Sequence, residues 1–132
     1  MKSNFDLARD LATKAANDLK MAEIGIAHDA PLDTVAFHVQ QTAEKLLKAL
    51  LASAEVDYPR THDLEALLDL AAPRWSVLET FRDPLLGLAS YAVDMRYDAA
   101  LYPSEEEVKT DLDAVRKLRD AVVNLLPLEA RP

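Results

Sequence analysis

Apolar residues in the first part of the chain recur at steps of three and four positions, which is the spacing of one helical face. This pattern predicts a first helix that begins after Ser3, with Asp6 as its capping-box partner, and that ends near Gly25. The face that we expect to be buried consists of Leu7, Leu11, Ala15, Leu19, Ala22 and Ile26.

A second helix is predicted from about Pro31 to Glu55, and it carries two stripes that point roughly opposite ways. The apolar stripe consists of Val35, Val39, Ala43, Leu46 and Leu50. The second stripe consists of Phe37, Gln41, Glu44 and Lys48. Either a partner chain or another segment covers the second stripe, or it is an exposed face with one aromatic residue and a Glu44–Lys48 ion pair. These four residues are therefore our candidates for a dimer or partner interface.

The middle of the chain predicts shorter elements. A third helix is expected with Thr61 as its N-cap, and residues 74–82 are expected to hold a further helical turn. Asp83 as an N-cap, followed by Pro84, predicts the start of a fourth helix that finishes near residues 96–98.

The last helix has the clearest start signal, a capping box formed by Ser104 and Glu107. Pro127 closes this helix, and we expect residues 127–132 to be a frayed tail. No segment alternates apolar and polar residues with a period of two, so no sheet is predicted. Residues 1–132 are therefore expected to form a single all-α domain, built as a helical bundle.

Composition narrows the range of functions. The net charge of −8, from 23 acidic and 15 basic residues, disfavours broad binding to phosphates but leaves room for a small basic pocket. The absence of cysteine excludes disulfides and thiolate sites. No apolar run approaches the ~20 residues that span a bilayer, and the N-terminus lacks the apolar segment of a signal peptide. We therefore expect a cytoplasmic protein.

Motifs that would supply catalysis or hold a cofactor are missing. Two isolated glycines cannot form a phosphate-binding loop, and His28, His38 and His62 lack the spacing of metal ligands. The acidic run at residues 105–107 stands at a helix start, where acids stabilise the helix dipole. We expect no metal, no cofactor and no self-sufficient catalytic motif.

One candidate ligand site is formed by Arg60 and His62, beside the N-terminus of the third helix. Free backbone N–H groups and positive charge there favour an anion. The alternative is structural: Thr61 caps the helix, Arg60 is solvated and His62 pairs with a nearby acid.

The other candidate site is formed by Tyr91 with Arg96, Tyr97 and Asp98 at the end of the fourth helix. An arginine flanked by aromatic residues can grip a phosphate and stack on a base. The alternative is that Arg96 satisfies the last helical carbonyls or pairs with Asp98, while the tyrosines fill the core.

Three segments together resemble the HEPN (higher eukaryotes and prokaryotes nucleotide-binding) family. They are AFHVQQTAEKLLKALL at residues 36–51, PRTHDL at residues 59–64 and YAVDMRY at residues 91–97. The resemblance implies an up-and-down bundle of four main helices with a short extra helix, and commonly a homodimer. It also implies a partner nucleotidyltransferase, frequently in a toxin–antitoxin pair.

Many HEPN proteins are metal-independent ribonucleases, in which an arginine and a histidine are separated by four to six residues. Here the equivalent positions after Arg96 are Leu101, Tyr102 and Pro103, and none is histidine. We therefore favour a domain that lacks this catalytic pair and binds a nucleotide, a nucleotidyltransferase or both. The alternatives are a dimeric scaffold, or a ribonuclease whose site is rearranged so that His62 or His38 reaches Arg96.

Overall fold

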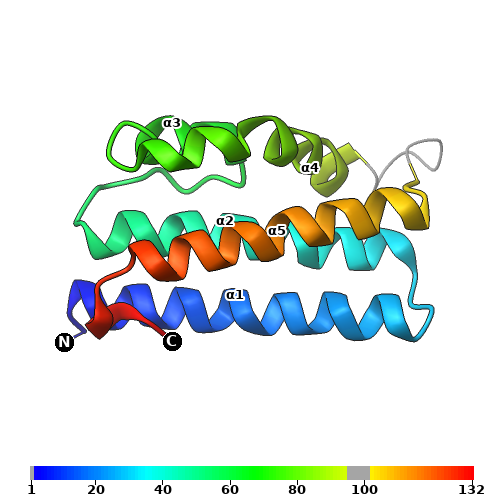
Figure 1. The fold of residues 1–132 in the computed structure, drawn as a ribbon, viewed down its shortest axis with the longest axis horizontal. Coiled ribbons are helices and arrows are strands. Elements are labelled where there is room, and N and C mark those ends of the chain that lie inside the picture. The colour runs from blue at the N-terminus through cyan, green and yellow to red at the C-terminus, as the bar shows by residue number, and fades with distance from the viewer. Residues whose placement is uncertain (1, 95–101) are drawn as a thin grey trace.

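The computed structural model describes residues 2–94 and 102–132, and every regular element within them is helical (Figure 1). The four long helices and the short one expected from the sequence are all present. The elements are α1 (Asn4–Ala27), α2 (Leu32–Ser53), α3 (Leu64–Ala71), η1 (Ser76–Phe81), α4 (Arg82–Asp94), α5 (Glu105–Leu125) and η3 (Leu128–Ala130).

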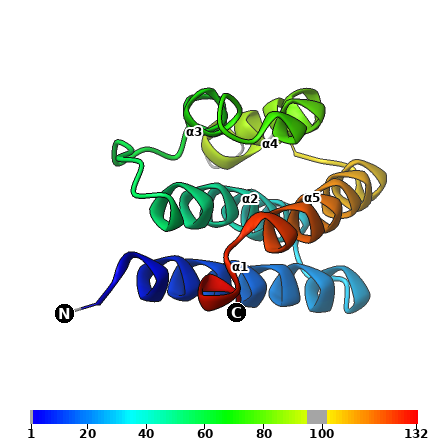
Figure 2. The same ribbon diagram turned by 60° about the vertical axis from the view of Figure 1, so that its left-hand side comes forward.

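The helices form an up-and-down bundle, because successive arms run in opposite directions (Figure 1). The short α3 and the α4 helix follow one another along the top of the view and together make the third arm. Figure 2 shows three tiers, with α1 on one side, α2 and α5 in the middle, and α3 with α4 on the other side. The α2 helix contacts all four of the other α-helices.

This central position buries α2 on two sides. Leu46 and Leu50, on the apolar stripe, are buried, and so are Leu47 and Leu51 on a different side of the helix. Glu44, from the second stripe, is buried as well. The interpretation in which another segment of the same chain covers this side therefore holds at Glu44.

The buried face of α1 is rotated relative to the expected one. Leu7 is 45% exposed, whereas Ala8 and Ala12 are buried with Ala15, Leu19 and Ala22. The expectation for Leu7 was wrong because α1 packs against α2 through its alanine-rich side. Small side chains there leave room for the larger residues of α2.

Two of the N-caps predicted from the sequence are present in the structure, and two are not. Ser3 and Asp6 form the reciprocal capping box on α1, and the Ser104 hydroxyl accepts from the Glu107 amide on α5. On α3 the cap is Asp63, not Thr61: its carboxylate accepts from the amides of residues 65 and 66. Asp83 does not cap α4, since that helix begins one residue earlier, directly after η1.

The end of the chain is more ordered than the expected frayed tail. Residues 128–130 form η3, which packs on α1, and Ala130 is buried. Arg131 donates to the backbone carbonyls of Leu126 and Asn124, which belong to the last turn of α5 and the residue after it. Unsatisfied carbonyls at a helix end are natural acceptors for such a side chain.

Candidate functional site

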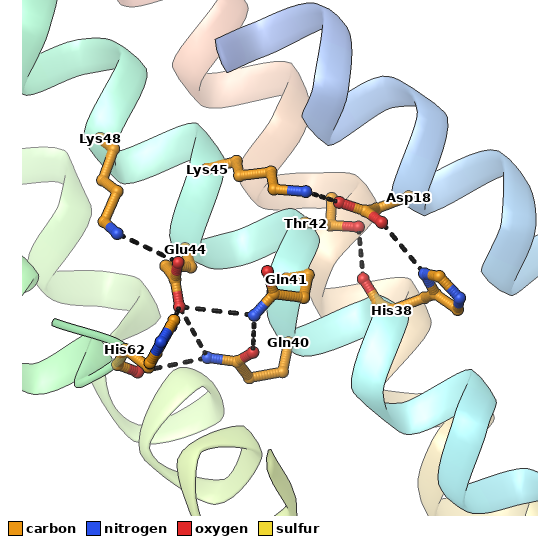
Figure 3. Close-up of polar contacts among 9 residues, drawn as sticks. All are labelled: Asp18, His38, Gln40, Gln41, Thr42, Glu44, Lys45, Lys48 and His62. Atoms are coloured by element: carbon orange, nitrogen blue, oxygen red, sulfur yellow. Dashed lines mark hydrogen bonds and ion pairs between the residues drawn. The ribbon is translucent and has the colours of Figure 1, made fainter. Parts of the chain in front are cut away.

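The polar stripe of α2 is organised around the buried carboxylate of Glu44. Its side chain is only 4% exposed and contacts one lysine and one histidine, as drawn in Figure 3. The Lys48 Nζ lies 3.1 Å from Oε2, one helical turn away, and the His62 Nδ1 lies 2.9 Å from Oε1. The predicted Glu44–Lys48 pair is therefore present. A buried carboxylate needs such partners, because removing a charge from water is costly unless it is paired and hydrogen-bonded.

Two glutamines complete this cluster. The fully buried Gln40 donates from Nε2 to the backbone carbonyl of His62 at 3.2 Å, and the same nitrogen lies 3.4 Å from Glu44 Oε1. The Gln41 amide donates to Gln40 Oε1 at 2.8 Å. The segment that carries His62 is thus attached to α2 through both its side chain and its backbone (Figure 3). We call these five residues the Glu44 cluster: Gln40, Gln41, Glu44, Lys48 and His62.

A second carboxylate makes a similar set of contacts between α1 and α2. Asp18, with its side chain 14% exposed, contacts Lys45 Nζ at 2.5 Å and His38 Nδ1 at 3.0 Å. The Thr42 hydroxyl donates to the backbone carbonyl of His38 at 2.8 Å. Each of the two carboxylates therefore pairs with one lysine of α2 and with the Nδ1 atom of one histidine (Figure 3).

The two histidines differ in their access to solvent. The His62 side chain is 76% exposed although its partner is buried, whereas the His38 side chain is 26% exposed and packs edge-on against the ring of Phe37. Among the residues that the structure describes, no hydrogen bond reaches Nε2 of His62. His62 therefore presents one ring nitrogen to solvent while the other is fixed.

At Arg60 and His62 the structure agrees with the structural interpretation, except that Asp63 and not Thr61 caps the helix. Arg60 is exposed and forms no ion pair with any described residue. The amides expected to be free at the start of α3 are partly occupied, because those of residues 65 and 66 donate to the Asp63 carboxylate. His62 pairs with an acid, Glu44, as the structural interpretation expected.

The second candidate site lies largely outside the described residues. Arg96, Tyr97 and Asp98 belong to residues 95–101, and Tyr91 lies in α4 at a position whose side chain is not described. Their proposed contacts with a ligand therefore stay predictions.

The interface candidates are only partly accessible. Phe37 and Gln41 are half-buried, and the Lys48 side chain is directed to Glu44, with its ammonium 5.9 Å from the centre of the Tyr58 ring. Burial raises the pKa of the Tyr58 phenol, which stays a neutral partner for this cation. A partner chain would therefore touch mainly Phe37 and Gln41 on this helix, and the interface itself stays a prediction.

Sequence reasoning missed Gln40, Asp18 and Lys45. Gln40 and Glu44 are four residues apart, so they lie on one helical face, and that spacing was a usable signal. Asp18 belongs to another helix, and no local spacing connects it with His38 or Lys45.

Elsewhere, the described residues contain no group of three or more ligand-type side chains that could hold a metal ion. The start of α5 is acidic, and burial together with the nearby charge of Glu107 raises the pKa of Asp111 to about 6.

No described helix is both long and apolar enough to pass through a bilayer.

Comparisons with known proteins agree with the helical architecture. The family model described as HEPN domain matches residues 8–126. Among solved structures, the crystal structure of ST0689, an archaeal HEPN homologue, is similar with a TM-score of 0.70 and 22% sequence identity. That match covers 92% of this chain and 96% of the archaeal chain, and at this identity it concerns the fold alone. No curated protein matches the chain.

Proposed function

Because the chain belongs to the HEPN domain family, we propose that it is a non-catalytic member that binds a nucleotide, a partner nucleotidyltransferase or both. The observation that carries this proposal is the residue set at positions 101–103, which are leucine, tyrosine and proline. A ribonuclease of this family needs a histidine there to move a proton. Tyrosine is a poor substitute near neutral pH, because its unperturbed pKa is about 10.

The contacts to a nucleotide are proposed for Arg96 and Tyr97, with Arg60 and His62 as a second group. Arg60 supports this role because it is an exposed cation without an acidic partner among the described residues, in a chain whose net charge is −8. An unpaired arginine offers a planar set of donors that suits a phosphate. His62 supports it because the ring is exposed and held in one position.

A homodimer is part of this proposal, with Phe37 and Gln41 at the contact between protomers. A toxin–antitoxin pair with a nucleotidyltransferase is the cellular setting that fits a domain of this kind. A dimeric scaffold without any ligand is the competing function if no nucleotide binds.

A ribonuclease with an unusual site is the second candidate, and one observation favours it. His62 holds its Nδ1 against the buried Glu44, which is how a carboxylate orients a histidine that transfers protons. Its open Nε2 would then replace the missing family histidine.

Two experiments separate these functions. The first is RNA cleavage by the metal-free protein, with wild type beside Arg96→Ala and His62→Ala. Equal absence of cleavage in all three supports the non-catalytic proposal, whereas cleavage by wild type alone overturns it.

The second experiment is calorimetric titration with ATP. We expect binding by wild type and weaker binding by Arg60→Ala and Arg96→Ala. Lys20→Ala is the matched control, since it removes an exposed cation from α1 that forms no ion pair within the described residues. No heat at millimolar ATP would reject the nucleotide part of the proposal.

A further inference from the structure

The Glu44 cluster does more than tie a loop to a helix, because it determines which nitrogen of His62 faces solvent. A carboxylate accepts hydrogen bonds but donates none when it is ionised. The Nδ1 of His62, 2.9 Å from Glu44 Oε1, must therefore carry the hydrogen. In a neutral ring the other nitrogen, Nε2, is then an acceptor with a free lone pair.

The charge of Glu44 is balanced before His62 is counted. Lys48 supplies a full positive charge at 3.1 Å from the other carboxylate oxygen. The carboxylate therefore does not need a charged imidazole, and a neutral ring with one N–H donor is a sufficient partner.

The free lone pair also indicates which kind of group would meet Nε2. An ionised phosphate offers no hydrogen to an acceptor nitrogen. A hydroxyl or an amino group can donate one and matches the free lone pair.

We propose that Glu44 is a positioning residue that fixes His62 as the Nδ1–H tautomer, so that Nε2 accepts a hydrogen bond from a hydroxyl or amino group of the nucleoside part of the ligand. This inference rests on the proposed function, since it assumes that a nucleotide is the ligand. It assigns the phosphate to Arg60 and not to His62.

The position of His62 is fixed well enough for this role. Its backbone carbonyl accepts from the buried Gln40, and its neighbour Asp63 is held by the amides of α3. A ring attached at both its side chain and its backbone loses little further freedom when a ligand binds. Binding by a preorganised group costs less entropy than binding by a mobile one.

The first test reads the tautomer directly from ring nitrogen chemical shifts in the free, full-length protein at neutral pH. We expect the Nδ1–H form for His62, and the Nε2–H form common in water for His28, which is exposed and forms no side-chain hydrogen bond with the described residues. Glu44→Gln should shift His62 towards the mixture seen in water. An Nε2–H form of His62 in the wild type would overturn the inference.

The second test uses His62→Asn, because an asparagine amide can still donate to Glu44 but has no counterpart of Nε2. The titrants are ATP and three analogues of it. 2′-DeoxyATP and 3′-deoxyATP each lack one hydroxyl, and ITP lacks the amino group. Wild type should lose about five- to tenfold in affinity for one of these analogues, the factor that one hydrogen bond provides. His62→Asn should bind ATP as weakly as wild type binds that analogue and should not distinguish the two. His28→Asn should behave as wild type.

The outcomes separate this inference from the proposed function. If wild type binds ATP and His62→Asn binds all four titrants equally well as wild type does, the inference is wrong and nucleotide binding stands. If wild type binds none of the titrants, both are wrong. If His62→Asn weakens the binding of ATP and of inorganic triphosphate by the same factor, His62 acts on the phosphates. The assignment of its partner to a hydroxyl or amino group is then wrong.

Discussion

The two glycines of the chain stand in helices but in different surroundings, and they give a matched pair of substitutions. A Cβ added to Gly25 in α1 would lie 2.8 Å from Cγ2 of Val35 and 3.3 Å from Cβ of Ala30. Among the described residues, a Cβ added to Gly87 in α4 would meet no neighbouring atom within 4 Å. Neither glycine has a positive φ, so the backbone itself accepts alanine at both positions.

The magnitudes follow from these distances. Carbon atoms pack best at about 3.5–4.0 Å, so Val35 would have to move by roughly 1 Å. Val35 is buried and β-branched, and forcing such a shift costs about 1–3 kcal/mol. Replacing glycine by alanine in a helix returns at most about 1 kcal/mol. We therefore expect Gly25→Ala to destabilise the protein by about 1 kcal/mol and Gly87→Ala to stabilise it by about 0.5–1 kcal/mol.

Urea unfolding followed by circular dichroism measures both changes. A double-mutant cycle with Val35→Ala tests the cause, because shortening Val35 removes the clash. The combined variant should then be more stable than the sum of the single effects predicts, by about 1.5–2 kcal/mol, which is the clash cost that the shorter side chain relieves. Equal stabilisation by Gly25→Ala and Gly87→Ala would refute the close approach of α1 and α2 at this point.

Three further predictions concern other parts of the fold. Asp111→Asn should stabilise the protein by about 1 kcal/mol at pH 7, the cost of ionising a half-buried acid, and by nothing near pH 4. The pKa of Asp111 is raised in the folded state, so its favourable contribution to stability is present below pH 4 and is lost as the pH rises through about 6. Urea unfolding at several pH values measures this change. A gain from Asp111→Asn that does not depend on pH would contradict it. Tyr102→Phe should cost about 0.5–1 kcal/mol in the same unfolding assay, because the Tyr102 hydroxyl accepts from the Leu32 amide at 2.8 Å, and no loss would mean that water replaces it. Phe37→Asp should give monomers in sedimentation, and an intact dimer would remove Phe37 from the interface.

The sequence was sufficient for the architecture because helical periodicity is a local property. The caps at Ser3 and Ser104 and the apolar stripe of α2 were predicted from residues within one or two turns of each other. The cap of α2 could not be predicted in this way. Pro31 provides no side-chain acceptor there, and the acceptor is Tyr102, which is 70 residues away from Leu32.

The candidate site, too, was predicted only where its contacts are local in the sequence. The Glu44–Lys48 pair spans one helical turn and was predicted. The sequence did not show why this pair is buried. That reason is the long-range contact with His62, which brings the segment before α3 onto α2. The rotation of the buried face of α1 was also missed, because alanines at 8 and 12 carry little hydrophobic signal although they decide how closely two helices pack.

The Glu44 cluster joins stability to the candidate function, and this affects how variants should be interpreted. Removing the Glu44 carboxylate leaves Lys48 without its anion in a largely buried place, so such a variant loses stability whether or not His62 binds a ligand. A loss of binding in that variant alone therefore proves little. His62 lies at the exposed edge of the same cluster, so its substitution by asparagine leaves Glu44, Lys48 and Gln40 paired. The asparagine can keep a hydrogen bond to Glu44 while the outward nitrogen is removed, so the two roles of the cluster can be measured separately.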